Sequence, residues 1–480
     1  RKTKNPMQEF DLICIGSGPA GQRAAVQASK LGKRVAVIEK QACLGGVCIE
    51  TGTIPSKTFR EAVRRLYAQD RLESEESHAP PQRPTMDRLM RHVAGVVGRE
   101  SQLVHDSLAR NDIRTFQGAA RFLGPNLLQV SGSHGEETIK AEKFLIAVGT
   151  RPAESRGVTL DGEIAVTSDS LLNLKRLPKS VVVVGAGVIG IEYASMFAAL
   201  GLKVTVVDKR PRPLEFLDHE IVDELIHQLR KVDVTFRCGD GLKSLEITHG
   251  DRKQALLELE SGKYLIAEMV LMSTGRVGNT DGLGLENVGL SPDDRGRIKT
   301  DAHFQTTVPH IYAAGDVIGY PSLAATSSEQ GRLAALHMFG EETTPLGDRF
   351  PIGIYSIPEI SMMGETEETL TAKKVPYETG IARYNETARG QILGDHSGMF
   401  KMVFHRDTGK LLGVHCIGSG ATELVHIGQA VMLMGGGLDY FINNVFNYPT
   451  LAECYKIASL NAYNKILLIR RFQSQRKTAS

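Results

Sequence analysis

Two glycine-rich turns, each followed by a carboxylate, are the residues of this 480-residue chain whose spacing most directly indicates chemistry. The turn Gly16-Ser17-Gly18-Pro19-Ala20-Gly21 precedes Glu39, and the turn Gly185-Ala186-Gly187-Val188-Ile189-Gly190 precedes Asp208. In this motif the first glycine permits a tight turn, the second lets the backbone approach a pyrophosphate, and the third lets a helix pack against a strand. The carboxylate accepts a hydrogen bond from a ribose hydroxyl. The sequence therefore predicts two dinucleotide-binding sites.

The two turns belong to an internal repeat. Apolar strands at 11–15 and 181–184 run into the glycines, a helical stretch follows each, and second strands end at Glu39 and Asp208. Corresponding residues are 169 positions apart without a gap, and each carboxylate lies 23 positions after its first glycine. This agrees with the ~20-residue spacing of the motif. A single such turn is weak evidence, but two in register predict two βαβ units of a Rossmann-like α/β fold.

Further strands end in residues that suit a nucleotide site. Segments 144–148, 271–274 and 311–314 are apolar and run into glycines, the last of them Gly315, which is followed by Asp316. A carboxylate there can accept a hydrogen bond from the hydroxyl of a ribityl chain, although such an aspartate is more often a turn residue. Two sites in one chain imply either two diffusible coenzymes or one resident flavin with one nicotinamide nucleotide.

Composition excludes several other classes of protein. Lys and Arg number 57 against 55 Asp and Glu, so there is no excess of positive charge for nucleic acid. No apolar run approaches the ~18 residues of a membrane span, and the residues before Met7 contain no signal-peptide core. Six cysteines are too few for a disulfide framework and show no metal-ligand spacing. We expect a cytoplasmic protein with no bound metal.

Several longer motifs resemble the flavoprotein disulfide reductase family, the class I pyridine nucleotide-disulfide oxidoreductases. The resemblance runs from about residue 9 to 468 and includes GSGPAG, LGGVCIETGTIPSK at 44–57, AAGDVIGYPSLAA and NYPTLAE. It implies a glutathione-reductase-like fold with two Rossmann-like domains and an α+β C-terminal dimerisation domain. The implied domains are FAD-binding at 1–150, NAD(P)-binding at 151–278, central at 279–349 and interface at 350–480. It also implies a homodimer with one FAD per subunit, and it leaves open whether the dimers form higher assemblies.

The chain departs from the family pattern at two positions. Family members carry a redox pair Cys-x4-Cys before Ile-Pro-Ser-Lys, but here Cys48 is followed by Thr53, whose hydroxyl cannot form a disulfide. The family's acid/base histidine, before Pro-Thr, is replaced by Tyr448, while its glutamate partner is present as Glu453. Cys43 and Cys48 also have the Cys-x4-Cys spacing, but Cys43 precedes the Gly45-Gly46 turn and is out of frame.

The two departures predict that dithiol chemistry has been lost while hydride exchange is kept. Several stretches, CIETGTIPSK among them, resemble the transhydrogenase subfamily, which implies NADPH + NAD⁺ ⇌ NADP⁺ + NADH in a ping-pong reaction at one nicotinamide site. Three alternatives remain open: a disulfide reductase with relocated cysteines, an NAD(P)H diaphorase, and a non-enzymatic nucleotide sensor.

The resemblance and the repeat together define the candidate site residues. Lys57, paired with Glu192, is expected to stabilise reduced flavin. Lys209 is the residue most expected to bind the 2′-phosphate of NADP. A solvated basic turn with no ligand explains Lys209 equally well. The expected catalytic set is Lys57, Glu192, Cys48 and Thr53. The expected FAD-binding residues are Gly16, Gly18, Gly21, Glu39, Gly46, Cys48, Lys57, Gly118, Thr150, Asp316 and Ala324. The expected NAD(P)-binding residues are Gly185, Gly187, Gly190, Asp208, Lys209, Arg210 and Gly275.

Overall fold

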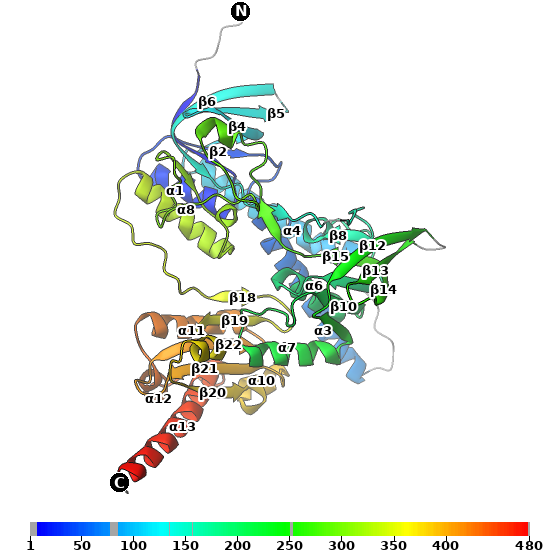
Figure 1. The fold of residues 1–480 in the computed structure, drawn as a ribbon, viewed down its shortest axis with the longest axis vertical. Helices are drawn as coiled ribbons and strands as arrows, with labels where there is room; N and C mark the ends of the chain where they lie inside the picture. The colour runs from blue at the N-terminus through cyan, green and yellow to red at the C-terminus, as the bar shows by residue number, and fades with distance from the viewer. Residues whose placement is uncertain (1–6, 77–84, 134, 156, 250–252, 479–480) are drawn as a thin grey trace, which may run out of the picture. The chain divides into compact units, whose positions relative to one another are not determined.

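A computed structural model describes residues 7–76, 85–133, 135–155, 157–249 and 253–478. The chain forms two compact units, each assembled from separate stretches of sequence (Figure 1). The first comprises residues 1–62, 84–177 and 274–347, and the second comprises residues 63–83, 178–273 and 348–480. Within the described residues, no helix is both long and apolar enough to cross a lipid bilayer.

The first unit is built on a seven-stranded sheet of order β3-β2-β1-β6-β5-β4, with β17 added beside β6. Strands β1, β2, β3 and β17 run parallel to their neighbours, while β4 and β5 form an antiparallel extension of β6. These strands are β1 (Glu9–Ile15), β2 (Val35–Glu39), β3 (Arg114–Gln117), β4 (Ala119–Gly124), β5 (Leu127–Gly132), β6 (Gly135–Ile146) and β17 (Ile311–Ala313).

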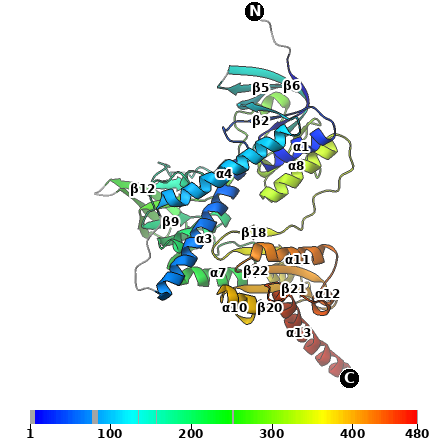
Figure 2. The same ribbon diagram turned by 180° about the vertical axis from the view of Figure 1, so that it is seen from behind.

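Helices α1 (Pro19–Lys30) and α8 (Ala324–Met338) lie side by side in the first unit, as both ribbon views show (Figures 1 and 2). Alanines at positions 20, 24, 25 and 28 of α1 are buried, and small side chains allow the close approach of two helices. The remaining elements that begin in this unit are α2 (Val47–Glu50), α3 (Thr53–Glu76), α4 (Met86–Ala109), β7 (Thr150–Pro152), β8 (Ala165–Thr167), α5 (Ser168–Leu171), β16 (Arg276–Gly278), η1 (Leu285–Val288) and η2 (Asp316–Ile318).

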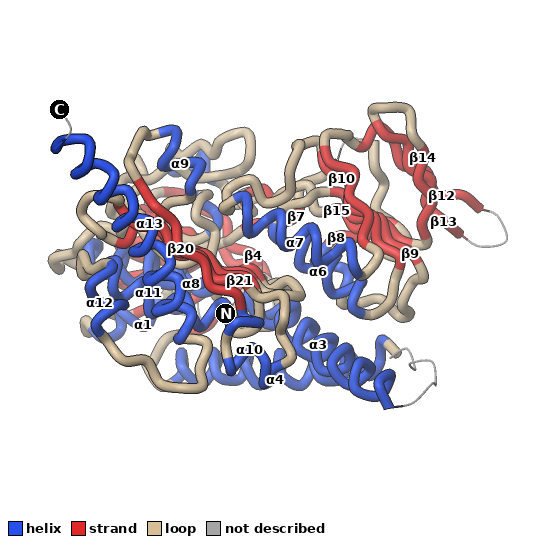
Figure 3. Tube along the Cα trace, turned by 90° about the horizontal axis from the view of Figure 1, so that it is seen from below, coloured by secondary structure: helices blue, strands red, loops and turns tan. Residues whose placement is uncertain are grey.

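The second unit contains a parallel sheet of order β11-β10-β9-β15. Figure 3 shows α6 and α7 on one side of this sheet and the antiparallel strands β12–β14 on the other. The elements are β9 (Ser180–Val184), α6 (Val188–Ala199), β10 (Lys203–Asp208), α7 (His219–Lys231), β11 (Val234–Cys238), β12 (Leu242–His249), β13 (Lys253–Leu259), β14 (Tyr264–Ala267) and β15 (Met269–Met272).

The remainder of the second unit is an antiparallel sheet of order β18-β19-β22-β21-β20, covered by helices. Its elements are β18 (Ile352–Ile354), β19 (Ile360–Gly364), α9 (Glu367–Ala372), β20 (Tyr377–Arg383), η3 (Tyr384–Glu386), α10 (Ala388–Leu393), β21 (Met399–His405), β22 (Leu411–Ile417), α11 (Ala421–Leu433), α12 (Leu438–Asn443) and α13 (Glu453–Thr478). This α+β arrangement is the one expected for the C-terminal part of the chain.

A buried ion cluster connects α7 to this antiparallel sheet inside the second unit. Lys401 of β21 is only 1% exposed, and its Nζ lies 2.9 Å from Asp218 and 2.6 Å from Glu220 and also contacts Glu367. Asp218 caps α7 by accepting from the Glu220 backbone N–H and is fully buried. His415 is buried near Asp218, and its Nδ1 has no hydrogen-bond partner among the described residues. The cluster places three carboxylates around one buried cation.

Candidate nucleotide-binding sites

The two glycine turns have the same backbone geometry, 169 positions apart. Gly16 and Gly185 adopt φ of 104° and 110°, a region that strongly favours glycine. A Cβ on Gly21 would lie 1.9 Å from the Gly16 carbonyl oxygen, and a Cβ on Gly190 would lie 1.9 Å from that of Gly185. The third glycine of each turn is therefore required for the helix to pack against its strand.

The carboxylates at the ends of β2 and β10 are also held in matching ways. The Ser17 backbone N–H donates to Glu39 at 3.0 Å, and the Ala186 N–H donates to Asp208 at 2.6 Å. A second backbone donor, two residues after each carboxylate, completes the pattern at 2.9 Å and 2.8 Å. The predicted repeat is confirmed down to individual hydrogen bonds.

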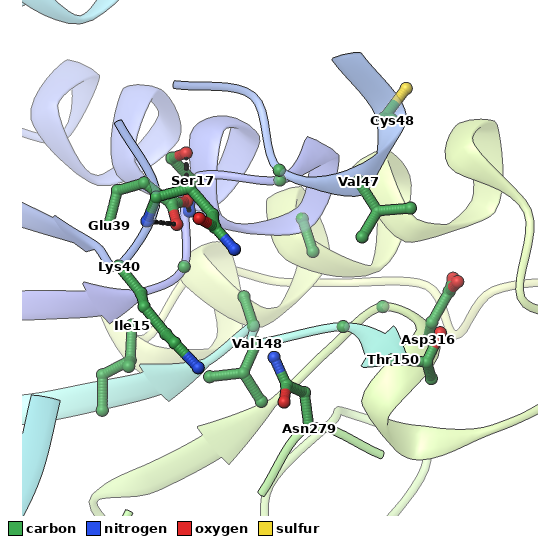
Figure 4. A pocket seen from close by; sticks show the side chains of 18 of the residues that line it. Ile15, Ser17, Glu39, Lys40, Val47, Cys48, Val148, Thr150, Asn279 and Asp316 are labelled. Carbon is green, nitrogen blue, oxygen red and sulfur yellow. Dashed lines mark hydrogen bonds between the residues drawn. The ribbon is translucent and has the colours of Figure 1, made fainter. Parts of the chain in front are cut away.

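The first turn opens into a cavity in the first unit (Figure 4). Ser17 and Glu39 lie at one end of it, and Thr150 and Asp316 lie at the other. The expected FAD residues that line it are Gly16, Gly18, Glu39, Gly46, Cys48, Gly118, Thr150, Asp316 and Ala324, together with Thr53 of the expected catalytic set. Gly21 and Lys57 are not part of the lining.

The residues of this cavity fit a dinucleotide such as FAD. A Cβ on Gly18 would meet no protein atom within 4 Å, so a side chain there would project into the cavity rather than into the protein. The first turn of α1 has no acidic residue and no side-chain cap, which leaves its N–H groups available to a phosphate. At the other end, burial raises the pKa of Asp316, so its carboxyl suits a hydroxyl partner.

Sequence reasoning missed several residues that position this site. The Ser17 hydroxyl donates to Glu39 at 2.5 Å and accepts from the Gly45 backbone at 2.9 Å, so it fixes the carboxylate against the following loop. Arg276 pairs with Asp169 at 3.0 Å and hydrogen-bonds both the hydroxyl and the carbonyl oxygen of Thr150. The repeat offered a signal for Ser17, because this polar residue stands where the second turn has an alanine.

Cys48 lies beside Thr53 at the cavity. Burial raises the pKa of the Cys48 thiol, and the neighbouring Thr53 side chain opposes this rise without cancelling it. Lys57 is half-buried and lies within electrostatic reach of this thiol. The Cys43 thiol instead contacts the Ser101 hydroxyl at 3.2 Å. All six cysteines lie in the described residues, and each is a free thiol.

The second turn differs from the first in what covers its carboxylate. Arg210 donates from Nε at 3.0 Å and from Nη2 at 2.7 Å to Asp208, whereas the matching residue of the first turn is Gln41. Burial opposes ionisation of Asp208, but the hydrogen bonds from Arg210 and Ala186 outweigh it and lower the pKa of this carboxyl. Asp208 is thus an ionised hydrogen-bond acceptor whose charge is already balanced by Arg210.

The other expected residues have different local surroundings. The Lys209 ammonium is 78% exposed and lies 3.1 Å from Glu260, so this lysine is directed to a carboxylate of the next hairpin. Glu192 is buried in α6 and accepts from the Tyr355 backbone N–H at 2.8 Å. Gly187 begins α6, which has no acidic first-turn residue and no side-chain cap. Gly275 belongs to the first unit and accepts from the Ala153 N–H.

The structure also describes the two residues of the C-terminal motif. Tyr448 is exposed between α12 and α13, and Glu453 begins α13 with a buried Oε2 that has no hydrogen-bond partner among the described residues. No group of three or more His, Cys, Asp or Glu side chains in the described ranges is arranged to hold a metal ion.

The chain is similar to known proteins in both sequence and structure. Residues 10–331 match the family "Pyridine nucleotide-disulphide oxidoreductase", and residues 350–459 match its dimerisation domain. A soluble pyridine nucleotide transhydrogenase of Mycobacterium bovis is 50% identical over 97% of this chain and 100% of its own. The protein of that name from Chromohalobacter salexigens is 44% identical over 96% of this chain and 99% of its own.

Solved structures support the same grouping. The crystal structure of LpdA from Mycobacterium tuberculosis superposes with a TM-score of 0.86 at 25% identity, over 94% of this chain and 99% of that one. The HOCl-induced flavoprotein disulfide reductase RclA from Escherichia coli superposes with a TM-score of 0.85 at 26% identity, with the same coverage. The fold is therefore the glutathione-reductase-like flavoprotein fold, as expected.

Proposed function

Because the chain belongs to the pyridine nucleotide-disulphide oxidoreductase family, we propose that it is an FAD-dependent transhydrogenase that catalyses NADPH + NAD⁺ ⇌ NADP⁺ + NADH. Relatives that carry the transhydrogenase name match nearly its whole length. Bound FAD would supply a ring that takes a hydride from one nicotinamide and returns it to another. The two coenzymes bind in turn at one site, so the kinetics are ping-pong. The matched dimerisation domain supports a homodimer, with one FAD per subunit.

The observation that carries the proposal is the pair Cys48 and Thr53 in the cavity lining. The side chain next to the Cys48 thiol in this lining is the hydroxyl of Thr53, which cannot take part in disulfide exchange. The raised pKa keeps that thiol protonated, and a thiol is a much weaker nucleophile than a thiolate. Reducing equivalents therefore leave through a second nicotinamide rather than through a dithiol.

Residues at both ends of the FAD cavity would bind the cofactor. Glu39 accepts from the adenosine ribose, the N-terminus of α1 binds the pyrophosphate next to Gly18, and Asp316 accepts from the ribityl chain. Lys57 provides positive charge close to the flavin, and Glu192 is its expected partner. Domain boundaries at 150, 278 and 349 remain predictions.

A reductive titration tests the proposal. Anaerobic dithionite should deliver about two electrons per subunit, because FAD alone accepts two, whereas FAD with an active disulfide accepts about four. In parallel, NADPH should reduce a spectrally distinct NAD⁺ analogue at steady state. Uptake of four electrons that falls to two in Cys43→Ser would identify a relocated dithiol and replace the proposal by the disulfide reductase. Diaphorase activity without coenzyme exchange would also contradict it.

Coenzyme preference gives a second prediction. Arg210→Gln should raise the KM for NADP(H) about tenfold or more and change the KM for NAD(H) by less than about threefold. The reason is that Asp208, no longer matched by a guanidinium, still accepts from a ribose hydroxyl but repels a 2′-phosphate. Lys209→Ala provides the comparison, with a smaller increase, because Lys209 already pairs with Glu260. Steady-state kinetics with each coenzyme varied separately would measure both effects, and equal effects on the two coenzymes would refute the assignment.

A further inference from the structure

A second cavity lies in the second unit, at the edge strand of its parallel sheet. Three polar residues on one face of α7, Asp223, His227 and Arg230, line it together with Cys238 of β11 and with Arg212 from the turn after β10. They are spaced four and three residues apart on α7, which places them on one side of the helix. The volume, about 510 Å³, lies within the ~300–1,000 Å³ typical of small-molecule sites.

The charges of this cavity are unbalanced. Arg212 forms an ion pair with Asp223, so these two side chains cancel. The side chains of Arg230 and His227 form no hydrogen bond or ion pair with any other described residue, and the Arg230 carbonyl accepts only from the backbone. Ile226 and Phe236 add apolar wall, while Arg230 and His227 are exposed and can be reached by a dissolved anion. The cavity therefore offers a guanidinium and an imidazole with no anion in place.

The position of the cavity relates it to the second dinucleotide turn. Cys238 is the register partner of Asp208 across β10 and β11, so the cavity opens one strand away from the carboxylate. Two of the basic residues after β10 already form ion pairs: Lys209 pairs with Glu260, and Arg210 pairs with Asp208. Cations without a carboxylate partner are found instead on α7.

We propose that this cavity binds a phosphate dianion, either free or as a monoester, with Arg230 and His227 as its donors. Arginine presents several N–H groups in a planar fork that matches phosphate oxygens, and imidazole adds one more donor. The phosphate can come from either of two sources. One is the 2′-phosphate of NADP(H), an assignment that rests on the proposed function, and the other is a free phosphate anion.

Inorganic phosphate is the probe for the site. Calorimetric titration of the FAD-loaded protein should give saturable binding that weakens about tenfold in Arg230→Gln and in His227→Gln. Arg237→Gln is the matched control: Arg237 lies between the lining residues Phe236 and Cys238, so its side chain points to the other face of β11. It should change the affinity less than twofold. Absence of binding, or equal weakening by the control, would overturn the proposal.

Repeating the titration with each coenzyme at saturation identifies the source. Displacement of phosphate by NADP⁺ but not by NAD⁺ would support the 2′-phosphate, and displacement by neither would support a free anion. Displacement by both would locate the phosphate in the dinucleotide turn and refute a separate site. No hydride transfer is measured, so a failure of the proposed transhydrogenase reaction would leave this result intact.

Discussion

Gly187→Val is expected to lower the rate of coenzyme exchange about a hundredfold or more while leaving FAD bound. A Cβ at Gly187 would meet only Arg210, at 3.9 Å, so a side chain has room at its first carbon and extends into the space next to the start of α6. The pyrophosphate of a nicotinamide nucleotide must approach that backbone closely. Because the substitution lies in the second turn, the cavity at the first turn is unchanged.

Two measurements check this result. The flavin absorbance per subunit of the purified variant should equal that of the parent protein, and the exchange assay should show the loss. The matched variant Gly18→Val should show the reverse order of defects, with flavin lost first, because Gly18 lines the FAD cavity. Retention of full exchange by Gly187→Val would mean that coenzymes do not use the second turn.

Lys401→Met is expected to lower the free energy of unfolding by about 3–5 kcal/mol at neutral pH. The substitution keeps the volume of the side chain but leaves the buried carboxylate of Asp218 without its cation. Lys373→Met is the control, since the Lys373–Glu365 pair is largely exposed and should contribute less than about 1 kcal/mol. Urea-induced unfolding of the FAD-loaded proteins would give both values.

The stability difference between Lys401→Met and the parent protein should also depend on pH, in a direction set by the pKa of Asp218. Burial opposes ionisation of Asp218, yet its neighbours His415 and Lys401 lower the pKa of this carboxyl in the folded protein. A depressed pKa contributes stability above the unfolded value, ~3.9, that is lost as the pH falls through the folded value. Without Lys401 that contribution is reduced, because only His415 and the Glu367 backbone N–H then remain to lower the pKa. The difference in free energy of unfolding between the two proteins should therefore narrow as the pH falls below about 4. A difference that is constant with pH would show that the loss comes from packing alone.

The sequence repeat predicted the nucleotide sheets well because the motif constrains the backbone itself. Strands expected to end at Glu39 and Asp208 end there as β2 and β10, and the helix expected to reach Lys30 is α1. A turn that needs glycine at three fixed positions, followed by a carboxylate at a fixed distance, leaves little freedom for any other fold.

Side-chain partners that come from distant parts of the chain could not be predicted in the same way. Lys209 and Glu260 are far apart in sequence, and only the position of the β13–β14 hairpin brings them together. Lys401 stands in a strand that otherwise reads as apolar, and nothing nearby in sequence indicates that its carboxylate partners begin α7 and α9.

The two glycine turns also bear on how long each bound nucleotide stays in its site. Their backbones match, so the difference in residence time between a cofactor that stays and a substrate that must depart has to come from what surrounds each turn. In the first copy, the Ser17 hydroxyl ties the carboxylate to the adjoining loop. In the second, the carboxylate is covered by the half-exposed side chain of Arg210, which water can reach. The two turns thus share one backbone geometry and differ in the side chain that contacts the carboxylate, Ser17 in the first and Arg210 in the second.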